Sequence, residues 1–144
     1  MDKNCTEKLM NILKDLHSVS ALTEYVSSLE EMRDPDAYLD YFLSLPEVKT
    51  LGKAEVIRRS GLDRTYCYQI LNGRKKAGRD KLICLCLAAG LSIRDTQRIL
   101  ELSKNGILYA RDRRDAILIF AFQNQLSVSK TNELLAQFQE SILD

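Results

Sequence analysis

The residues best suited to chemistry lie close together between positions 53 and 76. Arg, Gln, Asn and Thr side chains hydrogen-bond to base edges in the DNA major groove. The candidates for base contacts are Arg64, Thr65, Tyr68, Gln69 and Asn72. Basic and hydroxyl groups bind phosphates, and the candidates for phosphate contacts are Lys53, Arg59, Tyr66, Arg74, Lys75 and Lys76. These residue types predict binding of double-stranded DNA, with Gln69 or Asn72 on adenine and Arg64 on guanine.

The positive charge of the chain is concentrated in the same stretch. Residues 53–79 contain eight basic and two acidic residues, a net charge of +6. The whole chain of 144 residues carries +1, so the remainder carries −5. A run of charge is most often only a solvated face. Here it coincides with a helical pattern, which favours contact with phosphates.

Two short helices would position these side chains. The first is predicted over residues 53–60, with Ala54, Val56 and Ile57 as its apolar residues. The second is predicted over residues 64–72, where Cys67, Ile70 and Leu71 recur at helical spacing. Gly61 suits the turn between them, because a chain leaving a helix often needs a left-handed backbone, and Asp63 is a good N-cap. Two apolar faces joined by one glycine are typical of a helix-turn-helix.

Residues 53–73 resemble the helix-turn-helix of the XRE transcriptional regulators, whose fold is lambda-repressor-like. The matching positions are Val56, Gly61, Leu62, Tyr66, Ile70 and Gly73, followed by the basic loop GRKK at residues 73–76 and a further helix from Asp80. The family commonly has Gln where this chain has Lys53, Ala where it has Ile57, and Pro and Ser where it has Ala77 and Gly78. The family Gln helps to fix the first helix to the phosphate backbone, and a lysine still reaches a phosphate.

The resemblance extends over most of the chain. The stretches LSIRDTQRILEL, RDAILIF and TNELL are similar to the tail of XRE-type regulators of Firmicutes. This resemblance implies a cytoplasmic bacterial protein that regulates transcription. Such regulators usually bind DNA as two-fold homodimers with half-sites about one helical turn apart.

The N-terminal part reads as an acidic helical arm over residues 1–34. Apolar residues recur at three- and four-residue steps between Cys5 and Met32. Ser18 and Ser20 fall inside this run, so the pattern allows one helix or two. Pro35 bars helix continuation into it, and Asp34 is a natural cap. The acidic arm is also a candidate surface for a protein partner or for the dimer contact.

The predicted DNA-binding domain covers residues 35–104. It begins with an aromatic-rich helix over residues 36–45, which Pro46 ends, and residues 48–52 are interpreted as a connector. After the basic loop, residues 80–89 are apolar nearly all round and predict a buried helix. Another helix follows over residues 92–102, with Ser92 as its N-cap.

A repeat defines the remainder of the chain. Residues 79–108 align without gaps on residues 114–143, at an offset of 35. Residues 116–122 taken alone would suit a buried strand, but the repeat predicts a helix. Residues 105–144 are therefore expected to form a second helical hairpin on the same core. The predicted fold is all-α: a lambda-repressor-like helix-turn-helix bundle with an N-terminal helical arm and a C-terminal helical hairpin repeat.

Other function classes find no support in the residues. The single histidine, His17, has no partner for a catalytic triad, and no glycine-rich phosphate loop occurs. The four cysteines lack metal-ligand spacing and are interpreted as small buried hydrophobes in a reducing cytosol. The longest apolar run, residues 116–122, is too short to span a bilayer, and no signal peptide is recognisable. We expect a protein that is not an enzyme and has no metal, cofactor or membrane partner.

Two functions remain open. The first is a sequence-specific regulator that places residues 64–72 in the major groove of DNA. The second is a protein–protein interaction module that keeps the fold without operator binding. Lys53 in place of Gln, the half-apolar Tyr66 and Tyr68, and the acidic arm all suit this alternative.

Overall fold

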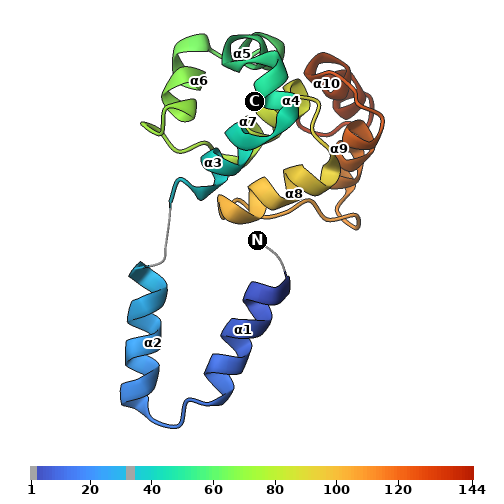
Figure 1. Ribbon diagram of the computed structural model, residues 1–144. Coiled ribbons are helices and arrows are strands. Elements are labelled where there is room, and N and C mark those ends of the chain that lie inside the picture. The colour runs from blue at the N-terminus through green and yellow to red at the C-terminus, as the bar shows by residue number, and fades with distance from the viewer. Residues whose placement is uncertain (1–2, 32–34) are drawn as a thin grey trace. The chain divides into compact units, whose positions relative to one another are not determined.

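The structure is a computed structural model that describes residues 3–31 and 35–144 (Figure 1). The described residues form ten α-helices and no strand, so the predicted all-α class is confirmed. The chain divides into two compact units, unit 1 over residues 1–34 and unit 2 over residues 35–144.

Unit 1 contains two helices, α1 (Lys3–Lys14) and α2 (Val19–Glu31). The break falls before Ser18, whose Oγ accepts a hydrogen bond from the backbone N–H of Ala21 at 3.1 Å and so caps α2. This settles the choice between one helix and two. The predicted ends of the helix at Met32 and of the arm at Asp34 lie outside the described residues.

Unit 2 contains the other eight helices. In chain order they are α3 (Ala37–Ser44), α4 (Pro46–Leu51), α5 (Lys53–Ser60), α6 (Arg64–Leu71), α7 (Arg79–Ala88), α8 (Ile93–Leu102), α9 (Arg113–Gln123) and α10 (Val128–Gln137). Helix α7 lies at the centre: α5 and α10 pack against it, and α3 packs against α8. Every residue from Leu82 to Ala88 is buried, which confirms the expected burial of this helix.

Residues 48–52 are not the predicted connector, because α4 covers most of them. Pro46 occupies the first position of α4, where its missing N–H would have no helical partner in any case. The backbone N–H of Lys49 donates to the carbonyl of Leu45 at 3.0 Å, and Val48 is buried. The proline that ends α3 therefore also begins a new helix. Gly52, with φ of 83°, ends α4.

The two halves of the repeat fold alike at the offset of 35, except that α9 begins one residue earlier than the offset gives. Ser92 and Ser127 cap α8 and α10 through their hydroxyl groups. The hydroxyl groups of Thr96 and Thr131 donate to the carbonyls of these serines at 2.9 and 2.8 Å. Left-handed residues also recur, at Gly90 and Gln125 and at Lys104 and Gln139. Residues 116–122 lie within α9, so the helix that the repeat predicted is confirmed.

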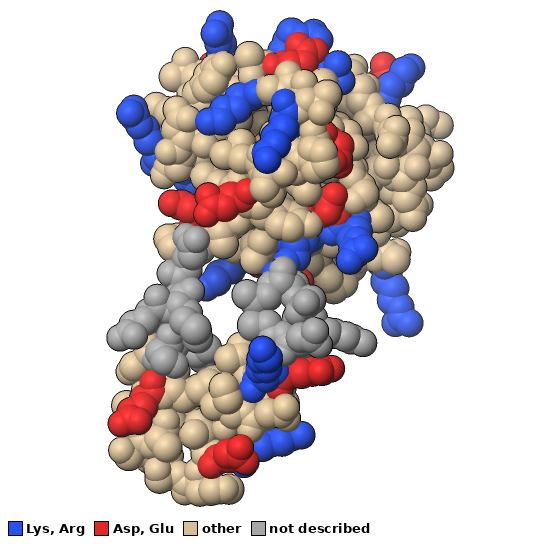
Figure 2. All heavy atoms as spheres, viewed as in Figure 1, with Lys and Arg blue, Asp and Glu red and all other residues tan. Residues whose placement is uncertain are grey.

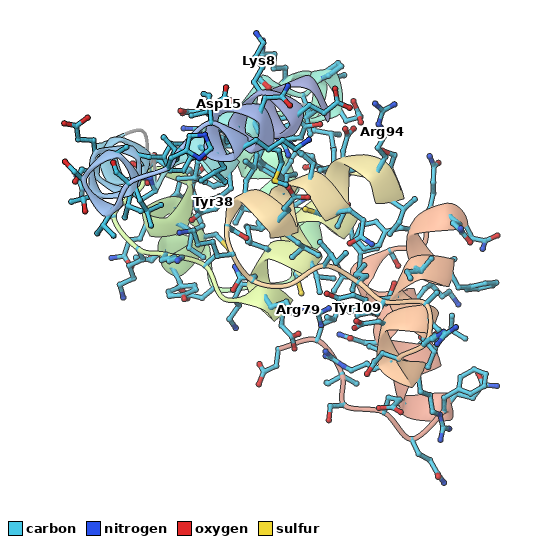
Figure 3. All side chains as sticks on the ribbon, turned by 90° about the horizontal axis from the view of Figure 1, so that it is seen from below. Lys8, Asp15, Tyr38, Arg79, Arg94 and Tyr109 are labelled. Carbon is cyan, nitrogen blue, oxygen red and sulfur yellow. The ribbon has the colours of Figure 1, made fainter. Side chains whose placement is uncertain are left out.

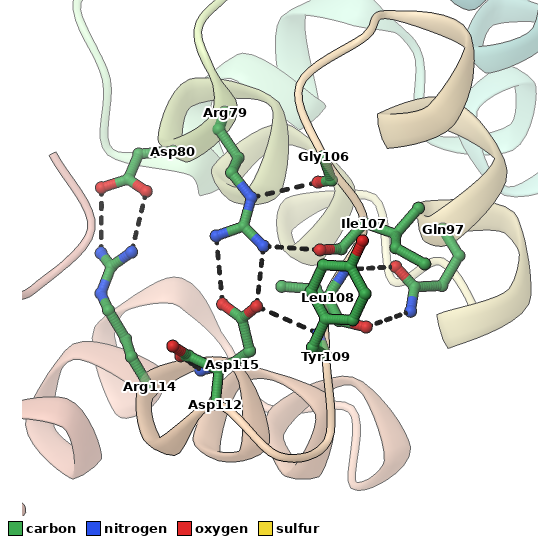
Figure 4. A network of polar contacts seen from close by, with 10 residues as sticks. All are labelled: Arg79, Asp80, Gln97, Gly106, Ile107, Leu108, Tyr109, Asp112, Arg114 and Asp115. Carbon is green, nitrogen blue, oxygen red and sulfur yellow. Dashed lines mark hydrogen bonds and ion pairs between the residues drawn. The ribbon is translucent and has the colours of Figure 1, made fainter.

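Reciprocal ion pairs join the two halves (Figure 4). The Arg79 guanidinium donates to both carboxylate oxygens of Asp115 at 3.0 and 2.9 Å. The Arg114 guanidinium donates to both carboxylate oxygens of Asp80 at 3.1 and 2.9 Å. Each half of the repeat therefore contributes one Arg-Asp dipeptide, whose arginine belongs to one pair and whose aspartate belongs to the other. The contacts between the two hairpins are reciprocal.

Backbone groups complete this exchange. Arg79 also donates to the carbonyls of Gly106 and Ile107, and Arg114 to those of Ser141 and Ile142, again 35 residues on. The backbone N–H of Tyr109 donates to the same Asp115 carboxylate at 3.0 Å, so Arg79 and Tyr109 lie close together (Figure 3). Burial raises the pKa of Asp115, but the Arg79 guanidinium and the Tyr109 N–H outweigh it and hold that pKa below its ordinary value.

Candidate nucleic-acid interface

The candidate site is built on a sharp corner between α5 and α6. Three residues separate the helices, and Gly61 adopts φ of 71°, a left-handed conformation that favours glycine. The buried Ser60 hydroxyl donates to the carbonyl of Ile57 at 2.6 Å and accepts from the N–H of Leu62 at 3.2 Å. Sequence reasoning did not single out Ser60, although a serine just before the glycine is well placed to bond the turn.

The apolar residues that the sequence assigned to these two helices are buried against the core, except Ala54, which is exposed. Val56 and Ile57 of α5 and Cys67, Ile70 and Leu71 of α6 all lie in the hydrophobic core. Burial raises the pKa of the Cys67 thiol, so this cysteine stays protonated and apolar. The orientation of α6 is therefore fixed by packing, and its opposite side faces outward.

Both ends of α6 are tied by hydrogen bonds. The Asp63 carboxylate accepts from the backbone N–H of Tyr66 at 2.8 Å, as expected for an N-cap. At the other end, the carbonyl of Gln69 accepts from the N–H groups of Arg74 and Lys75 at 2.8 and 3.1 Å. The basic loop is thus folded back on the last turn of α6.

The five candidates for base contacts share the outward side of α6. Arg64, Thr65 and Asn72 are exposed, while Tyr68 and Gln69 are half-buried. The Arg64 guanidinium lies 5.7 Å from the centre of the Tyr68 ring, one helical turn away. The side chains of Arg64, Thr65 and Asn72 form no hydrogen bond or ion pair with any described residue. These polar groups are available to an external partner.

The candidates for phosphate contacts fall into two sets. Lys53, Arg59, Arg74, Lys75 and Lys76 are exposed, whereas Tyr66 is half-buried. The Lys75 ammonium lies 5.3 Å from the centre of the Tyr66 ring, and the Lys81 ammonium lies 5.9 Å from it. Lys81 was missed by sequence reasoning, because its place beside Tyr66 depends on how α7 packs. Two ammonium groups therefore lie beside the Tyr66 ring, next to the loop.

A carboxylate holds both arginines of α5. Glu55 accepts from Arg58 and Arg59, and these bonds lower its pKa to about 2. Arg58, which was not among the candidates, lines a hollow of about 390 Å³ together with Arg64 and Tyr68. Arg59, which was a candidate, borders hollows shared with Val128 of α10. Arg58 is therefore the arginine of α5 that lies beside the base-contact candidates.

Arg79 belongs to the basic stretch in sequence but not to the candidate surface, because Asp115 and two carbonyls bind its guanidinium. Within the described residues, the cations of the stretch that form no ion pair are Lys53, Arg64, Arg74, Lys75 and Lys76. In Figure 2, Lys and Arg side chains lie along the upper and left edges of unit 2, where Figure 1 places α5, α6 and the loop after it.

Within the part of the chain that the structure describes, the remaining sequence candidates for chemistry form no second centre. Residues 3–31 and 35–144 hold no group of three His, Cys, Asp or Glu side chains suited to a metal ion. Burial raises the pKa of Cys84 and of Cys86 to about 12, in keeping with buried thiols, and the side chain of Cys5 lies outside the described part. No helix among the described residues has the length and apolar character needed to cross a membrane.

Comparison with known proteins gives no relative: no protein-family model, no curated protein and no solved structure matches the chain.

Proposed function

We propose that unit 2 is the DNA-binding domain of a transcriptional regulator. In this proposal α5 and α6 form a helix-turn-helix of the lambda-repressor-like kind, and α6 enters the major groove of double-stranded DNA. The observation that carries the proposal is the two-sided character of α6. Its apolar side is fully buried, and its exposed side presents Arg64, Thr65 and Asn72, none of which has a hydrogen-bond partner among the described residues.

The residue types assign roles along this side. Arg64 pairs with a guanine, and Gln69 or Asn72 pairs with an adenine, each worth ~1–3 kcal/mol of discrimination between bases. Lys53, Arg74, Lys75 and Lys76 hold phosphates at both edges of the helix. Tyr68 supports the Arg64 guanidinium on its ring at 5.7 Å. The loop carries three of these cations, so it supplies most of the affinity that is independent of sequence.

Selection of bound sites from random duplex DNA tests this function. We expect enrichment of a defined site by the full chain. Gln69→Ala changes the preferred base at one position of that site, whereas Gln123→Ala, an exposed glutamine at the end of α9, leaves the site unchanged. Failure to enrich any site, or an equal loss of affinity for all sequences from Gln69→Ala, contradicts the assignment.

One observation favours a protein-interaction module instead. The lining of the hollow between α5 and α6 includes the apolar residues Ala54, Ile57 and Leu62 and the ring of Tyr68. An apolar lining suits a peptide side chain better than a base edge. The two functions differ in their dependence on salt, because only phosphate contacts release counterions from DNA.

A further inference from the structure

An apolar groove lies open on unit 2 between α9 and α10, the two helices at the right of this unit in Figure 1. It has a volume of about 370 Å³ and is lined by Ala116, Ile117, Phe120, Leu134, Gln137 and Phe138. Phe120 is 51% exposed and Phe138 is 45% exposed. Two exposed phenylalanines beside one hollow are typical of a surface that binds another chain.

The internal repeat identifies the equivalent surface of the first hairpin, and that surface is closed. The counterparts of three groove residues lie 35 positions earlier in the chain, at Leu82, Leu85 and Ile99. These three are 2%, 1% and 0% exposed. The cover is helical, since α5 packs against α7 and α3 packs against α8. The first hairpin therefore shows that this kind of surface receives a helix.

Helix α3 shows the chemistry of such a cover. Its residues Tyr38, Leu39 and Phe42 are buried, so an aromatic and aliphatic side of the helix faces the core. At the margin of this side, the Tyr41 hydroxyl donates to the Asp95 carboxylate of α8 at 2.8 Å. The cover is thus an amphipathic helix with one polar bond beside its apolar contacts.

The second hairpin has no equivalent cover within residues 35–144. There, α9 and α10 pack chiefly against each other and against α7 and α8. Ile117 and Leu134 remain half-buried and Phe120 exposed, although their counterparts in the first hairpin are buried. The same helical hairpin that is closed in its first copy therefore presents an open groove in its second copy.

The polar position at the margin differs in sign between the two hairpins. Lys130 takes the place of Asp95, and it lies one helical turn before Leu134 of the groove. The Lys130 side chain is 70% exposed, and its ammonium lies 3.4 Å from the carboxylate of Glu133, which is 66% exposed. Such an exposed pair is weak, so a second carboxylate is able to bind the ammonium. An ammonium only donates hydrogen bonds, so the occupant has to supply an acceptor here.

We propose that the α9–α10 groove binds an amphipathic helix of another protein. The helix carries aliphatic or aromatic residues three or four positions apart on one side, as in other grooves that bind a helix, and a carboxylate that pairs with Lys130. Phe120, Leu134 and Phe138 contact its apolar side. The inference needs no DNA: loss of helix binding would leave the interface of α6 untouched, and loss of DNA binding would leave the groove.

Selection from a displayed peptide library tests the proposal with the full chain. The probes are alanine-based peptides of about 20 residues, long enough to form a helix in water, with varied residues along one side and at its margins. We expect enriched peptides to carry apolar residues at helical spacing and Asp or Glu at one margin. Absence of this pattern overturns the proposal.

Variants of the groove locate the binding. A synthetic, labelled copy of an enriched peptide is measured by fluorescence anisotropy. Phe120→Glu weakens its binding about 30-fold or more, as for a central anchor of an interface. Tyr109→Glu, at an exposed aromatic outside the groove, leaves the affinity unchanged. Circular dichroism checks that both variants stay folded. Equal affinity of the Phe120→Glu and unmodified chains contradicts the proposal.

Reversal of the charge at position 130 separates a specific site from a merely adhesive apolar surface. The measured quantity is the ratio of the affinities for the enriched peptide and for a copy with Lys in place of its acidic residue. Lys130→Glu lowers this ratio by a factor on the order of ten. Lys49→Glu, at an exposed lysine of α4, leaves the ratio unchanged. A ratio that Lys130→Glu does not change overturns the proposal.

Sedimentation equilibrium without peptide distinguishes another protein from a second copy as the occupant. We expect Phe120→Glu to leave the oligomeric state of the full chain unchanged. A self-associated chain that Phe120→Glu dissociates would mean that a second copy fills the groove, and would overturn the proposal.

Discussion

At the scale of single residues, Glu55 determines how much of the charge on α5 is available. Its carboxylate is bonded to both Arg58 and Arg59, which lie on an exposed surface close to the candidate interface. The pKa of Glu55 is lowered to about 2 by these bonds, so the carboxylate remains charged at any pH used for DNA binding. Two of the cations expected from the sequence are thus held by one anion.

Glu55→Gln should strengthen binding to duplex DNA. The change releases both arginines and removes a negative charge beside the phosphates, so we expect a steeper salt dependence, by about one additional phosphate contact. Fluorescence anisotropy with a labelled duplex at several salt concentrations measures this. Glu101→Gln, which breaks the pair with Arg98 on α8, serves as the control. Equal affinities for the Glu55→Gln and unmodified chains would exclude this role.

The Asp115 carboxylate joins the two hairpins, because it accepts from Arg79 and from the N–H of Tyr109. We expect Asp115→Asn to lower the free energy of unfolding by about 2–3 kcal/mol, less than for a fully buried pair, because Arg79 is 28% exposed. The folded pKa of Asp115 lies below the ordinary value of 3.8. The carboxylate therefore stabilises the fold above that pH and loses this effect as the pH falls through the folded pKa. Urea titrations should show a difference between the chains at pH 7 that shrinks below about pH 4; a constant difference would contradict this account.

At the scale of helices, the N-cap of α6 links stability to the candidate function. Asp63→Ala removes the bond to the N–H of Tyr66 and should cost about 1 kcal/mol. Ser127→Ala removes the equivalent cap of α10 and should cost a similar amount. Asp63→Ala also removes a negative charge beside the phosphates, so the informative quantity is the ratio of the affinities for the preferred site and for a scrambled duplex. Only Asp63→Ala should lower this ratio, since it loosens the helix that carries Arg64. Thermal unfolding and anisotropy with both duplexes measure this for the two variants, and an unchanged ratio would contradict it.

Most helices were predictable from the sequence because their signals are local. Caps at Asp63 and Ser92, and glycine at position 61, depend only on neighbouring residues. Pro46 was misleading, since the same residue ends one helix and begins another. For residues 116–122 the local signal was ambiguous, and the internal repeat decided it. All-α architecture follows from these elements, whereas their mutual packing does not.

The candidate site was predictable only in part. The outward side of α6 follows from the spacing of Cys67, Ile70 and Leu71. The choice between Arg58 and Arg59 depends on how α5 is rotated against its neighbours, which its few apolar residues leave undefined. Arg79 counted toward the basic stretch, yet its partner Asp115 lies 36 residues away and is reached only through tertiary packing. Long-range ion pairs leave no local trace in a sequence.

At the scale of the whole molecule, the net charge differs in sign between residues 1–34 and the rest of the chain. Residues 1–34 contain seven acidic and four basic residues, a net charge of −3, while the chain as a whole carries +1. Such a chain gains little long-range attraction to a polyanion. In the proposed function, binding to DNA comes from the local contacts of α6 and its loop, and the salt dependence of affinity reports those contacts directly.

The salt dependence of duplex binding is therefore the most direct test of the central claim. Four exposed candidates for phosphate contacts, Lys53, Arg74, Lys75 and Lys76, form no ion pair within the described residues. They predict a slope of about −4 per bound chain in a plot of log affinity against log salt. Changing Arg74, Lys75 and Lys76 to alanine should reduce the slope to about −1 and weaken binding to all sequences. The control change of Arg94, Arg111 and Lys130 to alanine, at exposed cations away from α6 and its loop, should leave it near −4. Absence of duplex binding at low salt, or the same slope for both triple variants, would contradict the account.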